Sequence, residues 1–271
     1  MREEPRESSR GEGVRGGSAR NDGAGALLSL EAIEKWYGEV HALRGVTLEV
    51  YPREIVGLIG DNGAGKSTLI KIISGVVPRS SGAIRWKGRK VRVGSVREAR
   101  RLGIETVHQD RAVVGSMSVA RNIFLGREPT RWMGPFRVLD RARMAQEAER
   151  LVKYLNLNIS SVDQDVRFCS GGEMQGVAIS RAMHFKASLV ILDEPTTALA
   201  VSGVQTVLDF ITRLKRDGIA CLFVTHNLHD VYAVADRFIV MARGSVAAVV
   251  ERKDCTVEDL ARLQVTRKAG A

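Results

Sequence analysis

The chain has 271 residues, 44% of them hydrophobic, which is enough for a sizeable core, and its three cysteines form no C-x-x-C pair that would indicate a disulfide framework or a zinc site. Basic residues outnumber acidic ones by 41 to 31, which makes nucleic acid, an anionic membrane surface and an anionic ligand the partners to consider. Aromatic residues make up only 5%, too few for a base-stacking platform, and no apolar run approaches the roughly 20 residues that a membrane span requires.

Residues 1–26 are mostly Arg, Glu, Ser and Gly, with almost nothing to bury, and this composition predicts a disordered tail. The tail lacks the apolar stretch of a secretory signal, and its glutamates count against an organelle transit peptide. Short apolar runs and turn signals begin at Leu27, so we predict a folded domain over residues 27–265.

The first half of this domain reads as strands around one helix. Residues 27–33 and 46–50 alternate like strands, and the continuous apolar run 55–59 is typical of a buried strand. A helix is expected to start in the glycine-rich stretch that follows and to end near Gly75. Two more strands are predicted, over residues 104–108 and 188–192.

Residues 111–186 read as mostly helical and predict a helical subdomain inserted into the α/β core. Asp140 is placed to cap a helix with an apolar face that includes Met144, Ala148 and Leu155. Beyond Pro195 the pattern predicts a helix over about 202–216, a strand over 220–225 and a last helix over 256–263.

The strongest chemical signal directly follows the apolar strand 55–59 and matches G-x-x-x-x-G-K-[ST]. It consists of Gly60, Asp61, Asn62, Gly63, Ala64, Gly65, Lys66, Ser67 and Thr68. Glycines let backbone N–H groups wrap a phosphate chain, and the next helix presents its positive end to the same anion. Lys66 can reach the β- and γ-phosphates and Ser67 can ligate Mg²⁺. The loop predicts nucleotide binding but leaves ATP or GTP, and transporter, kinase or helicase, open.

A second signal is the apolar strand 188–192, which leads into Asp193 and Glu194. Asp193 is placed to hold Mg²⁺, directly or through water, and Glu194 one residue later can activate a water as a general base. Gln109 and His226 also follow predicted strands. Because ligands of parallel sheets bind at the carboxyl ends of strands, we expect these side chains to meet there, with Gln109 and His226 facing the γ-phosphate.

The run Cys169-Ser170-Gly171-Gly172-Glu173 decides the class. It resembles the signature of ABC ATPases, usually written LSGGQ, and precedes Asp193-Glu194 at that family's spacing. The order of P-loop, Gln109, signature, Asp-Glu pair and His226 covers nearly all of the chain after the tail. Ser170 with the amides of Gly171 and Gly172 would make a second anion site at a helix start, which the resemblance assigns to the ATP of a partner cassette.

The resemblance implies the fold class α/β, a P-loop NTPase ABC cassette with a RecA-like core, an inserted helical subdomain and an N-terminal antiparallel β subdomain. Tyr37 is similar to the aromatic residue that stacks on adenine, and Gln109 joins Ser67 and Asp193 as an expected Mg²⁺ ligand. Two copies, or this chain and another cassette, would sandwich two ATP molecules. The implied partners are transmembrane permease subunits and, indirectly, an extracytoplasmic solute-binding protein, with the chain peripheral at the cytoplasmic face of the inner membrane.

The segment 118–128, together with the residues around Gln109 and His226, looks like the corresponding part of monosaccharide importers, with a fructose- or ribose-like substrate as the expectation. Three positions depart from the family pattern. Cys169 replaces Leu and is expected to be a small buried hydrophobe; Glu173 replaces Gln and adds a negative charge; Ala200 stands where many cassettes carry Asp in the loop joining the two ATP sites.

We therefore predict an ATP-hydrolysing subunit of an ABC transporter that powers monosaccharide import. The alternatives are a soluble ABC ATPase acting on nucleic acid or ribosomes, a P-loop kinase, and a degenerate regulatory cassette. The soluble enzymes typically contain a long coiled coil or two cassettes, which this sequence lacks, and the signature and His226 argue against a kinase. Intact Lys66, Asp193 and Glu194 argue against degeneration.

Overall fold

A computed structural model describes residues 25–108 and 113–266 of the chain. At its centre lies a six-stranded sheet in the order β12-β11-β3-β10-β9-β6. The strands from β11 to β6 pair in parallel, and β12 adds an antiparallel edge. Their bounds are β3 (Ile55–Ile59), β6 (Ile104–Val107), β9 (Leu189–Asp193), β10 (Ala220–Val224), β11 (Arg237–Ala242) and β12 (Ser245–Glu251).

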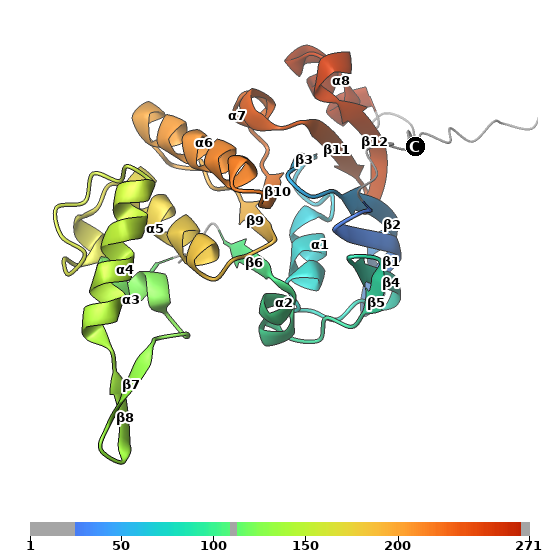
Figure 1. Ribbon diagram of the computed structural model, residues 1–271. Helices are drawn as coiled ribbons and strands as arrows, with labels where there is room; N and C mark the ends of the chain where they lie inside the picture. The colour runs from blue at the N-terminus through green and yellow to red at the C-terminus, as the bar shows by residue number, and fades with distance from the viewer. Residues whose placement is uncertain (1–24, 109–112, 267–271) are drawn as a thin grey trace, which may run out of the picture.

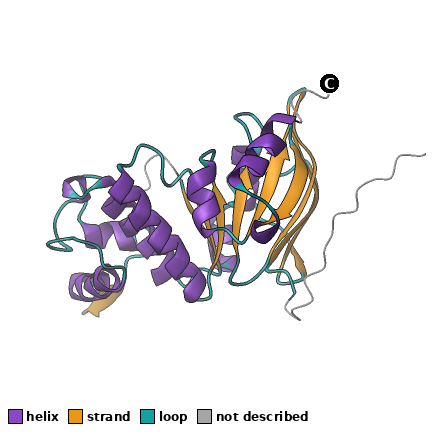
Figure 2. Ribbon diagram, turned by 90° about the horizontal axis from the view of Figure 1, so that it is seen from above, coloured by secondary structure: helices purple, strands orange, loops and turns teal. Residues whose placement is uncertain are grey.

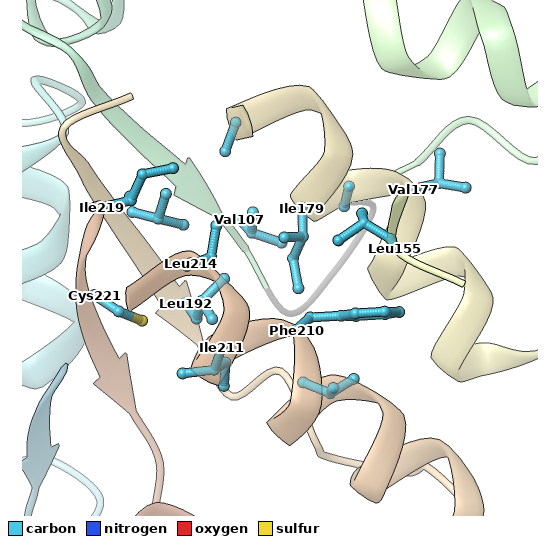
Figure 3. Close-up of a cluster of buried hydrophobic side chains, with 14 of the residues drawn as sticks. Val107, Leu155, Val177, Ile179, Leu192, Phe210, Ile211, Leu214, Ile219 and Cys221 are labelled. Atoms are coloured by element: carbon cyan, nitrogen blue, oxygen red, sulfur yellow. The ribbon is translucent and has the colours of Figure 1, made fainter. Parts of the chain in front are cut away.

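The central sheet is covered on both faces, which explains the continuous apolar runs of its strands. In β3, Ile55 and Ile59 belong to one buried cluster, while Val56 and Leu58 belong to another on the opposite face. Figure 3 shows part of the first cluster, where Leu192 and Cys221 lie close to Ile211 and Leu214 of helix α6. Each strand residue therefore contributes to a core on one side or the other.

A separate antiparallel sheet, in the order β2-β1-β4-β5, packs against the second cluster together with helices α1 and α2. The buried ion pair between Arg237 of β11 and Glu54, at 2.6 Å, ties the two sheets together, since Arg237 also donates to the carbonyl of Glu49 in β2. These elements are β1 (Leu28–Tyr37), β2 (Val40–Val50), β4 (Ser81–Trp86), β5 (Arg89–Val91), α1 (Lys66–Ile73) and α2 (Val96–Leu102).

A helical lobe lies at the other end of the molecule from the antiparallel sheet (Figures 1 and 2). It contains α3 (Val119–Phe124), α4 (Arg141–Tyr154) and α5 (Gly171–His184), with a short 3-10 turn, η1 (Val166–Phe168), before α5. Asp140 caps α4 by accepting a hydrogen bond from the Arg143 amide at 3.1 Å, as its sequence position predicts. The remaining elements are α6 (Val201–Arg216), α7 (Leu228–Val234), η2 (Arg252–Asp254) and α8 (Val257–Thr266).

The prediction that residues 111–186 are mostly helical is wrong for one segment. Strands β7 (Thr130–Met133) and β8 (Phe136–Leu139) form a hairpin that projects from the helical lobe, as Figure 1 shows. The turn is Gly134-Pro135, and Gly134 has φ +60°, a conformation that glycine adopts without steric cost. Each strand has only four residues, too few for a clear period-2 pattern.

The other expected elements exist, with ends that differ by a few residues, and the expected α/β architecture is confirmed. The sequence analysis did not identify β4, β5, α2, α7, β11 or β12. The domain limits at 27 and 265 and the subdomain limits at 111 and 186 stay predictions. The proposed tail lies outside the described residues, apart from residues 25 and 26.

Candidate nucleotide-binding site

The P-loop connects β3 to α1 and is held close to two neighbouring segments. A Cβ atom on Gly60 would lie 2.3 Å from the carbonyl oxygen of Met241, and one on Gly65 would lie 2.7 Å from the Leu43 side chain. Both glycines also have positive φ angles, +151° and +101°. The loop therefore requires glycine at these positions, both for space and for backbone conformation.

Lys66 begins α1 and is buried, although it carries an ammonium group. Its Nζ donates hydrogen bonds to the carbonyl oxygens of Gly60, at 2.5 Å, and Asp61, at 3.0 Å. Burial lowers the pKa of Lys66, and the carboxylates of Glu194 and Asp193 oppose this shift. Since Gly65 offers no side chain to cap α1, the helix start and the lysine together favour an anion.

Asp193 and Glu194 stand at the carboxyl end of β9, as the sequence predicts. Burial raises the pKa of the Asp193 carboxyl, and the nearby His108 imidazole opposes this shift. Glu194 has φ +51°, which is unusual for a non-glycine residue and costs on the order of 1–3 kcal/mol. A phosphate chain with a bound cation would favour the charged forms of both Lys66 and Asp193.

The end of β10 orients the Glu194 carboxylate. His226 places Nδ1 2.9 Å from Oε1 of Glu194, and the Thr225 hydroxyl donates to Oε2 at 3.1 Å. Thr197 adds a third contact, donating from Oγ1 to Oε2 at 3.3 Å. The expectation that groups from separate strand ends converge thus holds for Glu194 and His226. Thr225 was not singled out from the sequence, where it is one hydroxyl residue in an apolar strand.

A cavity of about 540 Å³ opens over these groups. Its lining includes seven of the nine predicted P-loop residues, together with both carboxylates. They are Asp61, Asn62, Gly63, Gly65, Lys66, Ser67, Thr68, Asp193 and Glu194. Ala64 lines a neighbouring cavity of about 400 Å³. The arrangement can bind a polyphosphate and place a carboxylate beside it.

The cavity is also lined by residues that the sequence analysis missed. Val40, His41, Ala42 and Arg44 come from β2, and Arg243 and Gly244 come from the turn between β11 and β12. The apolar run Phe238–Met241 was the available signal for β11, and a Gly after Arg243 was the signal for a turn. The basic side chains Arg44 and Arg243 add positive charge to the lining of the cavity.

The signature run lies elsewhere. Ser170 is the N-cap of α5, and its hydroxyl accepts from the Glu173 amide at 3.3 Å while the Glu173 carboxylate accepts from the Ser170 amide at 2.7 Å. This reciprocal pair is a capping box. Ser170, Gly171 and Gly172 do not line the P-loop cavity. Cys169 is buried, as expected, and burial raises the pKa of its thiol.

Comparison with known proteins agrees with this geometry. Residues 43–197, more than half of the chain, match the family described as ABC transporter. The chain belongs to the ABC transporter family. Within it, the cassette is similar to the xylose/arabinose import ATP-binding protein XylG of Sulfolobus acidocaldarius, with 39% identity over 90% of this chain and 96% of the relative. It is also similar to the fructose import ATP-binding protein FrcA of Rhizobium meliloti, with 43% identity over 86% and 91%.

Among solved structures, the ABC transporter cassette MJ1267 superposes with a TM-score of 0.77 and 25% identity, covering 90% of this chain and 99% of that one. The ABC cassette fold expected from the sequence is therefore confirmed. An ABC cassette is an ATPase, so the chain is an ATP-binding enzyme subunit. None of the helices in the described ranges has both the length and the apolar character of a membrane span.

Among the predicted site residues that the structure describes, Tyr37, His226 and Gly60 do not line the P-loop cavity. Tyr37 ends β1 and pairs with Val40, which lines the cavity, but its own ring is 44% exposed and lies under the Lys35 ammonium, 4.9 Å away. The neighbouring Trp36 instead stacks on His41, with ring centroids 3.8 Å apart. Gln109 lies outside the described residues, directly after His108.

The oxygen atoms of two side chains at this cavity suit a Mg²⁺ ion. Ser67 and Asp193 line the same cavity, and Mg²⁺ is usually held by one or two protein oxygen ligands together with phosphate oxygens. In the described part of the chain no three His, Cys, Asp or Glu residues cluster as a metal site of their own. A cation here would thus depend on the nucleotide for part of its coordination.

Proposed function

We propose that this ABC cassette hydrolyses Mg²⁺-ATP to power the import of a monosaccharide through transmembrane permease subunits. The observation that carries the proposal is the cavity that gathers Lys66, Asp193 and Glu194 around one opening. Support for the solute comes from the two relatives named for xylose/arabinose and fructose import. No observation in the described residues favours the nucleic-acid or ribosome alternative.

In the proposed mechanism, Lys66 releases its carbonyl partners and binds the β- and γ-phosphates. Ser67 and Asp193 would hold Mg²⁺, with Gln109 as a further ligand, and the ion would neutralise charge on the phosphates. Glu194 takes a proton from the attacking water while Thr225 and His226 hold its carboxylate in place. Tyr37 stacks on the adenine after a rotation away from Lys35.

The signature completes the site from a second cassette. Ser170 and the amides of Gly171 and Gly172, at the start of α5, would meet the γ-phosphate held by the partner's P-loop. Binding of two ATP molecules closes the pair, and hydrolysis reopens it, which moves the permease between inward- and outward-facing states. The cassette is then peripheral at the cytoplasmic face of the membrane, and a solute-binding protein acts on the permease from the other side.

The test is reconstitution of the cassette with candidate permease subunits from the same organism, in vesicles loaded with ATP. Uptake of labelled fructose, ribose, xylose and arabinose is compared with that of an amino acid. We expect uptake of one of these sugars and none with Glu194→Gln. Uptake of the amino acid alone, or ATPase activity that responds to nucleic acid and not to the permease, would contradict the proposal.

A further inference from the structure

The hairpin formed by β7 and β8 exposes three large apolar side chains at its tip. Trp132 is 71% exposed, Met133 60% and Phe136 69%. A two-stranded hairpin is marginally stable on its own, so three exposed apolar side chains at its end are costly in water. Figure 1 shows the hairpin pointing away from the body of the cassette. The proposed import function assigns no role to these side chains.

The register places apolar side chains on both faces of the hairpin. Met133 pairs with Phe136, and Trp132 pairs with Arg137, one step further from the turn. Because neighbouring residues of a strand point to opposite faces, Trp132 lies on one face, and Met133 and Phe136 lie on the other. Both faces of the hairpin are therefore apolar next to the turn. A partner that covers only one face would leave the apolar side chains of the other exposed.

Positive charge follows directly behind the apolar tip. The hairpin residues 130–139 contain two arginines and no acidic residue, a net charge of +2. Arg137 lies over the Trp132 ring, with 5.9 Å between its guanidinium carbon and the ring centroid, and Arg131 pairs with Val138 on the other face. Each face thus carries an apolar side chain near the turn and an arginine behind or beside it.

We propose that the hairpin tip inserts into the headgroup region of an anionic lipid bilayer, so that the cassette contacts the membrane directly as well as through its permease. Lipid surrounds an inserted wedge on all sides, which matches a tip that is apolar on both faces. Tryptophan prefers the interface between headgroups and acyl chains, and arginines behind the tip would reach the lipid phosphates. The inference goes beyond the import function and does not depend on the identity of the sugar.

The alternative binding partner for the hairpin tip is a groove on a permease protein. A protein groove binds a β-hairpin most easily along one face or edge, and the arrangement of charge around this tip gives it no preferred face. The salt-sensitive attraction between arginines and anionic headgroups needs only the net charge of the segment. The residues of the tip therefore favour a lipid surface as its binding partner.

The first measurement is co-sedimentation of the full chain with vesicles of phosphatidylcholine alone or mixed with phosphatidylglycerol. We expect binding to the anionic vesicles that weakens with added salt. Trp132→Ser combined with Phe136→Ser should lower the partition coefficient at least about tenfold. Arg137→Gln should lower it about fivefold, the equivalent of ~1 kcal/mol per arginine.

Val249→Ser, which alters an exposed apolar residue of β12 outside the hairpin, is the matched control and should bind like the unmodified chain. Basal ATPase activity shows that each variant is folded. Equal binding by the unmodified chain and the double hairpin variant would overturn the proposal, as would failure of the unmodified chain to bind anionic vesicles. Unchanged vesicle binding with loss of permease co-purification in the double variant would assign the tip to protein instead.

Tryptophan fluorescence gives a second, independent measurement. The chain has three tryptophans, and Trp86 is only 6% exposed, so replacing Trp36 by Phe leaves Trp132 as the reporter that faces solvent. Insertion should shift its emission to the blue with anionic vesicles, and lipids brominated near the headgroup should quench it. A Trp132 emission that stays unchanged when the chain sediments with vesicles would show adsorption without insertion and overturn the proposal.

Discussion

The cassette has two helix starts to which we assign anion contacts, and they are built differently. Helix α1 begins after Gly65, which has no side chain to cap it, and the buried ammonium of Lys66 lies at its first turn. Helix α5 begins at Ser170, whose capping box with Glu173 satisfies the amides of these two residues and does not use those of Gly171 and Gly172. The start of α1 lines the same cavity as Asp193 and Glu194, and the start of α5 does not line that cavity.

This difference supports the half of an ATP site that we propose for each region. The P-loop region brings the proposed phosphate, cation and base residues to one cavity, which suits a region that holds the nucleotide. The signature region has its cap completed within its own helix, where the Glu173 carboxylate accepts from the Ser170 amide. In the proposed function it acts on a nucleotide that a second cassette brings to it.

The largest effect is expected from Glu194→Gln, which removes the proposed base and preserves the shape that Thr225 and His226 contact. ATP hydrolysis should fall by about 100-fold or more, while ATP binding persists. Steady-state ATPase and equilibrium binding of labelled ATP measure the two effects. The same change at the exposed Glu258 of α8 is the control. Turnover near that of the unmodified chain would assign the base to another group.

Lys66→Ala should mainly weaken binding, because charged hydrogen bonds to the phosphates are lost. Each such bond contributes about 1.5–3 kcal/mol, which corresponds to roughly a 10- to 100-fold lower affinity for ATP. Calorimetry with ATP measures the change, and the exposed Lys253→Ala serves as control. An unchanged dissociation constant would contradict the assignment of Lys66 to the phosphates.

Mixing two inactive variants tests whether the two regions meet across a dimer. Lys66→Ala damages the P-loop half of both sites, and Ser170→Arg damages the signature half of both with a bulky side chain. In a mixed dimer one site collects both lesions and the other is whole. With random pairing about half of the dimers are mixed, so the mixture should regain about a quarter of normal ATPase activity if sites act independently.

The mixing experiment depends on communication between the sites, and Ala200 bears on that. Many cassettes carry Asp at this position, and here Ala200 precedes α6 without a side-chain cap. Independent sites are therefore expected. Full activity of Ser170→Arg on its own would show that the signature does not complete the partner's site. Lack of recovery despite proven subunit exchange would indicate strictly coupled sites or a different partner cassette.

The smallest effect is expected from Glu173→Gln. Gln can also accept a hydrogen bond from the Ser170 amide, so the capping box should survive and the melting temperature should change little. Removal of a negative charge from the signature should raise ATPase activity slightly, within about twofold. Glu173→Ala is the comparison, and losing the cap should cost about 0.5–2 kcal/mol of stability. A fall in ATPase activity with Gln would contradict a repulsive role for the carboxylate.

The sequence predicted the structure best where a single local rule determines a feature. Ile55–Ile59 is apolar without alternation because both faces of β3 are covered, and Asp140 caps a helix with a regular apolar face. The convergence of Glu194 with His226 followed from the rule that parallel strands end at one edge of a sheet. The ABC family and its ATPase activity were also recognised from the motifs, and the comparisons confirm them.

Other features depend on contacts between distant segments, which the local pattern does not specify. Arg243 and His41 are far apart in the chain and line one cavity only because the β11–β12 turn packs beside β2. The hairpin at 130–139 was hidden in a segment with a helical pattern on both sides. The orientation of Tyr37 depends on Lys35, whose ammonium lies over its ring, and its contact with adenine stays a prediction.

Gly172 and Gly176 have a mechanical consequence. A methyl group on Gly172 would lie 3.0 Å from the Cα of Gly203, and one on Gly176 would lie 2.7 Å from the Phe210 ring. Helix α5 therefore meets α6 backbone to backbone at Gly172 and packs directly on the Phe210 ring at Gly176. Helix α6 follows Asp193 after one short loop. Tight contact over two successive turns leaves little room for sliding. A displacement at the end of β9 is therefore transmitted to Ser170 as a movement of one stiff pair of helices.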